Sequence, residues 1–134
     1  MILDLKEKPY LTINVVFIFL ICMIMGYSLV NSPDEGEYPI PCIHEQLTGQ
    51  PCVSCGLSHS FSLIIRGRTD EALQWNQYGM RIFLFFAIQL VARILFSFLW
   101  PRFGKPVILF DIFFSSVFLL YSFWPFILWI LGGY

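Results

Sequence analysis

Three cysteines and two histidines lie close together in the one long polar connection of this chain: Cys42, His44, Cys52, Cys55 and His59. Thiolate and imidazole groups are the preferred ligands of zinc in proteins. Thiols also form disulfides in oxidising compartments and exchange them when their pKa is low. Any covalent, metal or redox chemistry of this protein is therefore expected between residues 42 and 59.

The first interpretation of these cysteines is a structural disulfide. Cys42 would pair with Cys52 or Cys55, leaving the third thiol free. The closed loop would hold about a dozen residues and stabilise the fold by about 3 kcal/mol in the loop-entropy treatment. This interpretation requires that the connection lies outside the cytoplasm, where thiols are oxidised.

Two other interpretations stay open. In one, Cys42, His44, Cys52 and Cys55 bind zinc tetrahedrally, with His59 as an alternative fourth ligand. In the other, Cys52 and Cys55 are a redox pair. Cys55 would precede a helix, whose N-terminal dipole stabilises a thiolate.

The composition predicts what must position this segment. The chain has 134 residues, of which 57% are hydrophobic, 19% aromatic and only 13% charged. Soluble domains carry about 25% charged residues. We therefore expect an all-α integral membrane protein, with residues 1–134 forming one membrane domain in a lipid bilayer. The net charge of −1 gives no reason to expect nucleic acid as a partner.

Three apolar segments are long enough to cross the bilayer, at about residues 11–30, 82–100 and 107–131. A helix needs about 20 residues to cross about 30 Å of hydrocarbon. The first segment exceeds the apolar run of a signal peptide, about 7–15 residues, so we expect a retained helix. Residues 101–105 are too few for anything but a tight turn between antiparallel helices.

Residues 31–80 connect the first two spans and contain one or two short helices. Leu57, Phe61, Ile64 and Ile65 fall on one face of a helix, and Gly67 follows as its C-cap. The polar residues of this segment, including Ser62, fall on the other face. A helix this short cannot span the bilayer, so it is expected at the membrane interface.

A second short helix is indicated further along the same connection. Thr69 is a suitable N-cap, and Asp70 and Glu71 match the positive end of the helix dipole. Gly79 is expected to close this helix before the second span.

The basic residues predict an orientation. Lys6 and Lys8 precede the first span, and Arg102 and Lys105 lie in the turn after the second. Lys and Arg accumulate in cytoplasmic segments. The N-terminus is therefore expected in the cytoplasm, with the cysteine segment and the C-terminus on the outer side.

Two charged residues lie within the spans. Ionisable side chains are costly there and are usually paired or functional. Arg93 and Asp111 lie at similar depths on either side of the predicted turn. We expect them to form an ion pair that holds the second and third spans together, with Gln89 one helical turn from Arg93.

The cysteine segment resembles a family of small bacterial multi-pass membrane proteins known as a domain of unknown function. The matching positions are Cys42, Leu47-Thr48-Gly49-Gln50-Pro51, Cys52-Val53-Ser54-Cys55-Gly56-Leu57, Gly67, Ala72 and Asn76. Val53 replaces a proline of the family signature, Ser58-His59 replace Thr-Arg, and Gln77 replaces a proline. The resemblance implies a bacterial inner-membrane location and supplies no reaction.

The leading function hypothesis is a small, non-catalytic accessory or scaffold subunit of a larger inner-membrane complex, with a disulfide-stapled outer loop. The sequence holds no nucleotide-binding loop, carboxylate pair or catalytic triad. The alternative is a membrane thiol-disulfide oxidoreductase that uses Cys52 and Cys55. A weaker alternative is a zinc- or anion-binding module, in which zinc would be the single cofactor.

Overall fold

The computed structural model describes residues 8–34, 43–50 and 53–132, and it leaves the side chain of His44 undescribed. It is 84% helical, and the described ranges contain no strand, so the prediction of an all-α fold is confirmed. The helices are α1 (Pro9–Val30), α2 (Ile43–Thr48), α3 (Leu57–Ile65), α4 (Thr69–Trp75), α5 (Gly79–Phe103) and α6 (Lys105–Gly132).

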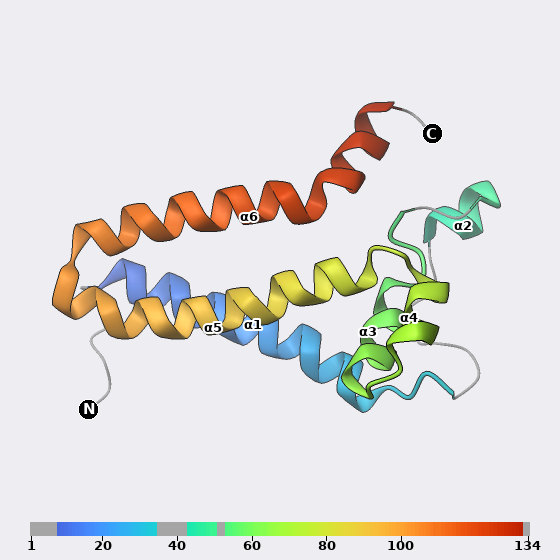
Figure 1. The fold of residues 1–134 in the computed structure, drawn as a ribbon, viewed down its shortest axis with the longest axis horizontal. Coiled ribbons are helices and arrows are strands. Elements are labelled where there is room, and N and C mark those ends of the chain that lie inside the picture. Colours follow the sequence, from blue (N-terminus) through green and yellow to red (C-terminus); the bar gives the residue numbers. More distant parts are fainter. Residues whose placement is uncertain (1–7, 35–42, 51–52, 133–134) are drawn as a thin grey trace.

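Three of these helices, α1, α5 and α6, are long and apolar enough to cross a membrane. This confirms the prediction of a membrane protein with three spanning helices. Helix α5 is central, because α1 packs along one side of it and α6 along another (Figure 1). The short helices α3 and α4 gather where α1 ends and α5 begins (Figure 1).

The turn between α5 and α6 is shorter than the sequence predicts. Pro101 lies inside α5, and only Gly104 separates the two helices. A proline so near the helix end removes one hydrogen bond, the one to the carbonyl of Ser97, and the helix continues past it. The chain reverses at Gly104, whose φ of 64° is accessible to glycine at little cost.

Pro125 bends the last turns of α6 away from the bundle (Figure 1). Proline has no N–H group, so the carbonyl of Tyr121 loses its partner within the helix. Arg81 of α5 donates to this carbonyl, and its guanidinium lies 4.1 Å from the centre of the Tyr121 ring. A basic side chain of α5 thus satisfies the backbone group that the bend leaves unpaired.

Helix α3 ends as the sequence predicts. Gly67 has a φ of 78°. The N–H of Gly67 donates to the carbonyl of Ile64, and the N–H of Arg68 donates to that of Leu63, both at 2.9 Å. This is the Schellman arrangement, which satisfies two of the carbonyl groups left unpaired at a helix end.

The buried surface of α3 is not the predicted apolar face. The buried residues are consecutive, Ser60, Phe61, Ser62 and Leu63, so the expectation that Ser62 lies on a polar outer face is wrong. Helices α1, α4 and α5 surround this turn of α3, so residues from all sides of it are covered. The buried hydroxyl of Ser62 is satisfied because it donates to a backbone carbonyl, that of Asn31.

Three further details differ from the sequence prediction. Thr69 is the first residue of α4, and the N-cap is Arg68. Gly79 begins α5 and does not close α4. The segment Ile43–Thr48 forms an additional helix, α2, which the sequence pattern did not indicate. Gly79 packs closely against α3. A Cβ atom at this position would lie 2.0 Å from Oγ of Ser60, so there is no room for a side chain.

We expect Gly79→Ala to lower the free energy of unfolding by about 1–3 kcal/mol, because the new methyl group forces α3 and α5 apart. Ser60→Gly in the same chain should restore most of the loss by removing the atoms that clash. Gly26→Ala is the matched control, since a Cβ there meets no atom within 4 Å. The measurement is unfolding in detergent followed by circular dichroism; equal stability of the two alanine variants would contradict the predicted contact.

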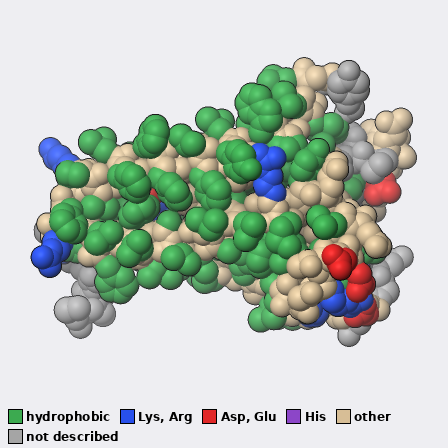
Figure 2. Space-filling model, viewed as in Figure 1, with side chains coloured by type: hydrophobic (Ala, Val, Ile, Leu, Met, Phe, Trp, Pro, Cys, Tyr) green, Lys and Arg blue, Asp and Glu red, His purple; other side chains and the backbone are tan. Residues whose placement is uncertain are grey.

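Charged side chains lie mainly at the two ends of the molecule, and apolar side chains cover the surface between them (Figure 2). Arg102 and Lys105 flank the α5–α6 turn at one end. Asp34, Arg68 and Glu71 form ion pairs at the other end, beside α3 and α4. This distribution suits a protein that crosses a bilayer with its two ends in water.

Candidate functional site

The carboxylate of Asp111 is the centre of a polar cluster inside the three spans. Arg93 of α5 donates to its Oδ2 at 2.7 Å, and the hydroxyl of Tyr10 on α1 donates to the same oxygen at 2.7 Å. Ser115, one turn further along α6, donates to its Oδ1 at 2.9 Å. The structure thus brings Arg93 and Asp111 together, and it adds a partner from α1.

Arg93 binds the surrounding polar groups with the rest of its guanidinium. It donates to Oδ1 of Asn14 at 3.1 Å, to Oε1 of Gln89 at 3.3 Å and to the hydroxyl of Ser115. The amide of Asn14 in turn donates to Ser97 at 3.1 Å. Each of the three spanning helices therefore contributes to one continuous network.

Burial decides what this cluster can do chemically. The side chain of Asp111 is 2% exposed and that of Arg93 is 11% exposed. A charge in such a place is stable only when it is paired and fully hydrogen-bonded. Both oxygens of Asp111 are engaged, so its carboxylate is arranged to hold helices together and is not open to act as a general base.

The sequence pointed to three members of the network, namely Arg93, Asp111 and Gln89. Sequence reasoning missed the contributions of Tyr10, Asn14 and Ser115. Asn14 was visible as a polar interruption in an otherwise apolar span, and this was the available signal. Its full burial shows that the interruption faces the bundle interior.

The cysteine segment is only partly described. Cys55 is disulfide-bonded, and its partner lies outside the described residues. Cys42, Cys52 and the side chain of His44 are also outside them. The predicted zinc ligand set rests on these positions, so it stays a prediction. Among the residues that the structure describes, no group of three His, Cys, Asp or Glu side chains could hold a metal ion.

Gly56 follows Cys55 and lies against the backbone of α4. Its φ is 74°, and a Cβ atom there would lie 2.8 Å from the carbonyl oxygen of Trp75. Both the backbone angle and the close approach require glycine. The cysteine segment is thus held directly against the end of α4.

Asn76 is the residue that connects the cysteine segment to the end of α4. It is 7% exposed, and its Nδ2 donates to the carbonyls of Val53 at 2.8 Å and Cys55 at 3.0 Å. Its Oδ1 accepts from the N–H of Tyr78 at 2.8 Å. Sequence reasoning assigned no role to Asn76, although it matches the family signature. A buried amide that satisfies three backbone groups explains why asparagine suits this position.

His59 packs against Trp75, with ring centres 3.9 Å apart and ring planes 20° from parallel. Desolvation by burial is the main cause that lowers the pKa of His59 below its usual value. Burial therefore favours the neutral form of the imidazole. A neutral ring binds an anion weakly, which counts against His59 as an anion ligand.

Arg66 attaches α3 to the end of α1. Its guanidinium donates to the carbonyls of Ser28 at 3.2 Å and Leu29 at 2.9 Å, both in the last turn of α1. It also donates to the hydroxyl of Ser62 at 2.6 Å. Cationic side chains stabilise helix C-termini by satisfying unpaired carbonyls and by opposing the helix dipole.

We expect Arg66→Ala to lower the free energy of unfolding by about 1 kcal/mol, because it removes the hydrogen bonds and the positive charge that this guanidinium brings to the end of α1. Hydrogen exchange in α3 should accelerate. Arg66→Lys should recover only part of the loss, since one ammonium group cannot reproduce the planar fork of donors.

Arg68→Ala is the matched control for this prediction. Arg68 pairs with Asp34 and Glu71 at the surface, and the pairing lowers the pKa of Glu71. Exposed ion pairs contribute little to stability, because solvent screens their charges. If Arg68→Ala destabilised the protein as much as Arg66→Ala, the attachment of α3 to α1 would not depend on Arg66.

Residues 42–90 match a family model described as a protein of unknown function (DUF2752). The match confirms the resemblance to an uncharacterised domain family. It covers Arg66, Asn76, Gly79 and Gln89 and ends before Arg93. Comparison with the curated proteins and with the solved structures gives no match.

Proposed function

We propose that this chain is a non-catalytic accessory or scaffold subunit of a larger protein complex in a bacterial inner membrane. The observation that carries the proposal is the closed network around Asp111. The buried carboxylate of Asp111 and the guanidinium of Arg93 are engaged in joining α1, α5 and α6. Such an arrangement gives a rigid three-helix unit and offers no reactive group.

The outer surface of the bundle supports the same proposal. Only 17–28% of the most apolar window of each spanning helix is buried within the chain. Large apolar side chains on α6 are exposed over its length, among them Phe110, Phe113 and Leu131. A small chain that buries so little of its apolar surface has much area left for neighbouring membrane helices.

The position of the charges supports the proposed orientation. Lys8 begins the described chain next to α1, and Arg102 and Lys105 lie at the α5–α6 turn. These residues would mark the cytoplasmic end by the positive-inside rule. The cysteine segment, α3 and α4 would then lie on the outer side, where a disulfide between Cys42 and Cys55 would staple the loop.

Co-purification tests this proposal. The chain, carrying a C-terminal affinity tag and expressed at native level, is extracted in a mild detergent, and its partners are quantified by mass spectrometry. The expected result is at least one other membrane protein at a fixed ratio in successive preparations. A three-span protein with the same tag serves as the control. A monodisperse 15.6 kDa monomer would contradict the proposal.

A second candidate function is thiol-disulfide exchange by Cys52 and Cys55. The observation that favours it is that Cys55 is disulfide-bonded and lies just before α3. In this reaction the disulfide of the chain would be reduced to two thiols while a dithiol of a partner protein is oxidised. Thiol-disulfide exchange requires that Cys55 is bonded to Cys52, whereas the structural disulfide of the scaffold proposal requires that Cys55 is bonded to Cys42.

A further inference from the structure

A cavity of about 380 Å³ lies among the three spanning helices, next to the polar network. Its walls include Phe17 of α1, Phe85 and Gln89 of α5, and Ser116 and Phe123 of α6. Pockets for small molecules usually measure about 300–1,000 Å³ and are mostly apolar with a few polar groups. This cavity has both properties.

Gln89 supplies an unused hydrogen-bond donor at this cavity. Gln89 is 5% exposed, and its Oε1 accepts from Arg93 at 3.3 Å and lies 3.4 Å from Oγ of Ser115, whose proton is donated to Asp111. Arginine only donates, so it determines which end of the amide faces it. The Nε2 group then has no hydrogen-bond partner within the described part of the chain. A buried donor without a partner is costly, and a bound acceptor would remove that cost.

The depth of Gln89 restricts the source of that acceptor. Gln89 lies about 15 Å along α5 from its start at Gly79, at a rise of 1.5 Å per residue. The hydrocarbon core is about 30 Å thick, so Gln89 lies near its middle. The ester carbonyls of phospholipids lie at the interface and do not reach this depth. A small molecule that supplies the acceptor must therefore dissolve in the hydrocarbon core.

We propose that this cavity binds an uncharged, lipid-soluble aromatic carbonyl compound, whose carbonyl oxygen accepts from Nε2 of Gln89. The ligand is uncharged because Asp111 already neutralises Arg93. It is aromatic because phenylalanine rings from all three helices line the cavity, and rings pack on one another with favourable geometry.

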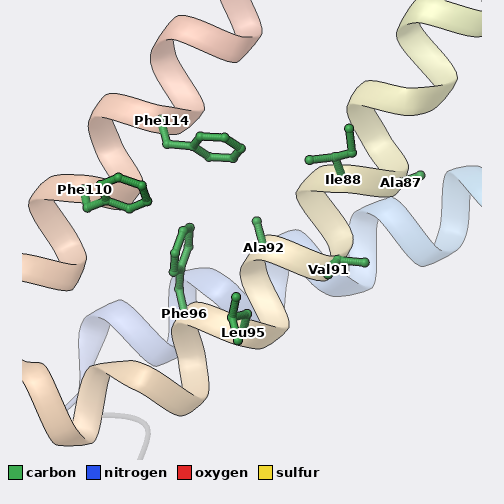
Figure 3. Close-up of a pocket in the computed structure, with 8 residues that line it drawn as sticks. All are labelled: Ala87, Ile88, Val91, Ala92, Leu95, Phe96, Phe110 and Phe114. Atoms are coloured by element: carbon green, nitrogen blue, oxygen red, sulfur yellow. The ribbon is translucent and has the colours of Figure 1, made fainter.

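A second hollow in the spans provides an internal comparison. It measures about 500 Å³ and lies between α5 and α6 (Figure 3). All of its lining residues are apolar, with Phe96, Phe110 and Phe114 among them (Figure 3). Acyl chains can fill such a groove without specificity. Binding driven by apolar contact alone would therefore occupy this larger groove at least as well as the cavity at Gln89.

Photolabelling with benzophenone tests the proposal, since benzophenone carries one carbonyl between two aromatic rings and reacts where it binds. The protein is labelled in lipid nanodiscs at increasing benzophenone concentration, and the labelled peptides are identified by mass spectrometry. We expect saturable labelling at the cavity, and labelling that rises linearly at the groove of Phe110. Gln89→Leu should weaken labelling at the cavity about tenfold, the effect of one hydrogen bond of about 1.4 kcal/mol.

Ser116→Leu provides a second variant, because Ser116 lines the cavity and is exposed, away from the buried network. The added side chain narrows the cavity and should also abolish saturable labelling, with the melting temperature unchanged. The proposal would be overturned by equal labelling of cavity and groove. It would also be overturned if saturable labelling of the cavity persisted in both variants. If Gln89→Leu does not fold, persistence of saturable cavity labelling in Ser116→Leu is enough to overturn the proposal.

Discussion

Asp111→Ala is expected to lower the free energy of unfolding by about 3–5 kcal/mol, because it leaves the guanidinium of Arg93 buried without its counter-charge. The same substitution removes the acceptor for the hydroxyl groups of Tyr10 and Ser115. The measurement is equilibrium unfolding in mixed detergent micelles, followed by circular dichroism.

The double variant Arg93→Met/Asp111→Leu is the control that separates pairing from packing. Replacing both partners of a buried ion pair by apolar residues of similar size is often close to neutral. The double variant should therefore be more stable than Asp111→Ala alone. If the double variant lost at least as much stability as the single one, the loss would come from packing, and the ion pair would not be what holds the helices together.

Asn76→Ala is expected to cost about 2–4 kcal/mol, because it leaves the carbonyls of Val53 and Cys55 and the N–H of Tyr78 without partners. The effect should be local, since these groups join the cysteine segment to α4 and the start of α5. Hydrogen exchange at residues 53–80 should accelerate, while exchange in the middle of α5 and α6 stays unchanged.

Gln77→Ala and Asn76→Asp are the comparison variants for this prediction. Gln77 is exposed and adjacent, so its replacement should be close to neutral. Aspartate has the shape of asparagine but cannot donate, and its charge would repel the two carbonyls. If Asn76→Asp were as stable as the original protein, the hydrogen bonds that Asn76 donates would not be what holds the cysteine segment against α4.

Much of the fold follows from the sequence because apolar runs of about 20 residues have few alternatives. The three spanning helices are of this kind. The ends of the helices are less predictable, since they depend on single residues. Pro101 suggested the end of α5, but the helix continues for two more residues. A proline at this position removes only one backbone hydrogen bond, and Gly104 is the first residue that adopts a positive φ easily and so reverses the chain.

The short helices show a second limit. The C-cap at Gly67 is a local feature and could be predicted, whereas the burial of Ser60 and Ser62 depends on which helices surround α3. The contact between Ser60 and Gly79 joins residues far apart in the sequence. A periodic pattern on one helix cannot indicate that its polar side is also covered.

The same reasoning applies to the polar network. Arg93 and Asp111 flank a short turn, so their depths follow from the helical rise alone. Tyr10 and Asn14 lie on α1, which is apolar around most of its circumference, so its rotation about its own axis cannot be read from the pattern. Only the packed structure shows that these two residues face the pair.

The measurement that tests the proposed function most directly is the identity of the disulfide partner of Cys55. The protein is alkylated with and without reductant after extraction under acid quench, and the cross-linked peptides are identified by mass spectrometry, with zinc measured on the same sample. The expected result is a stable bridge from Cys42 to Cys55, a free thiol at Cys52 and no zinc. A Cys52–Cys55 bridge that reduces and reforms readily, or three alkylated thiols with one zinc ion, would contradict the scaffold assignment.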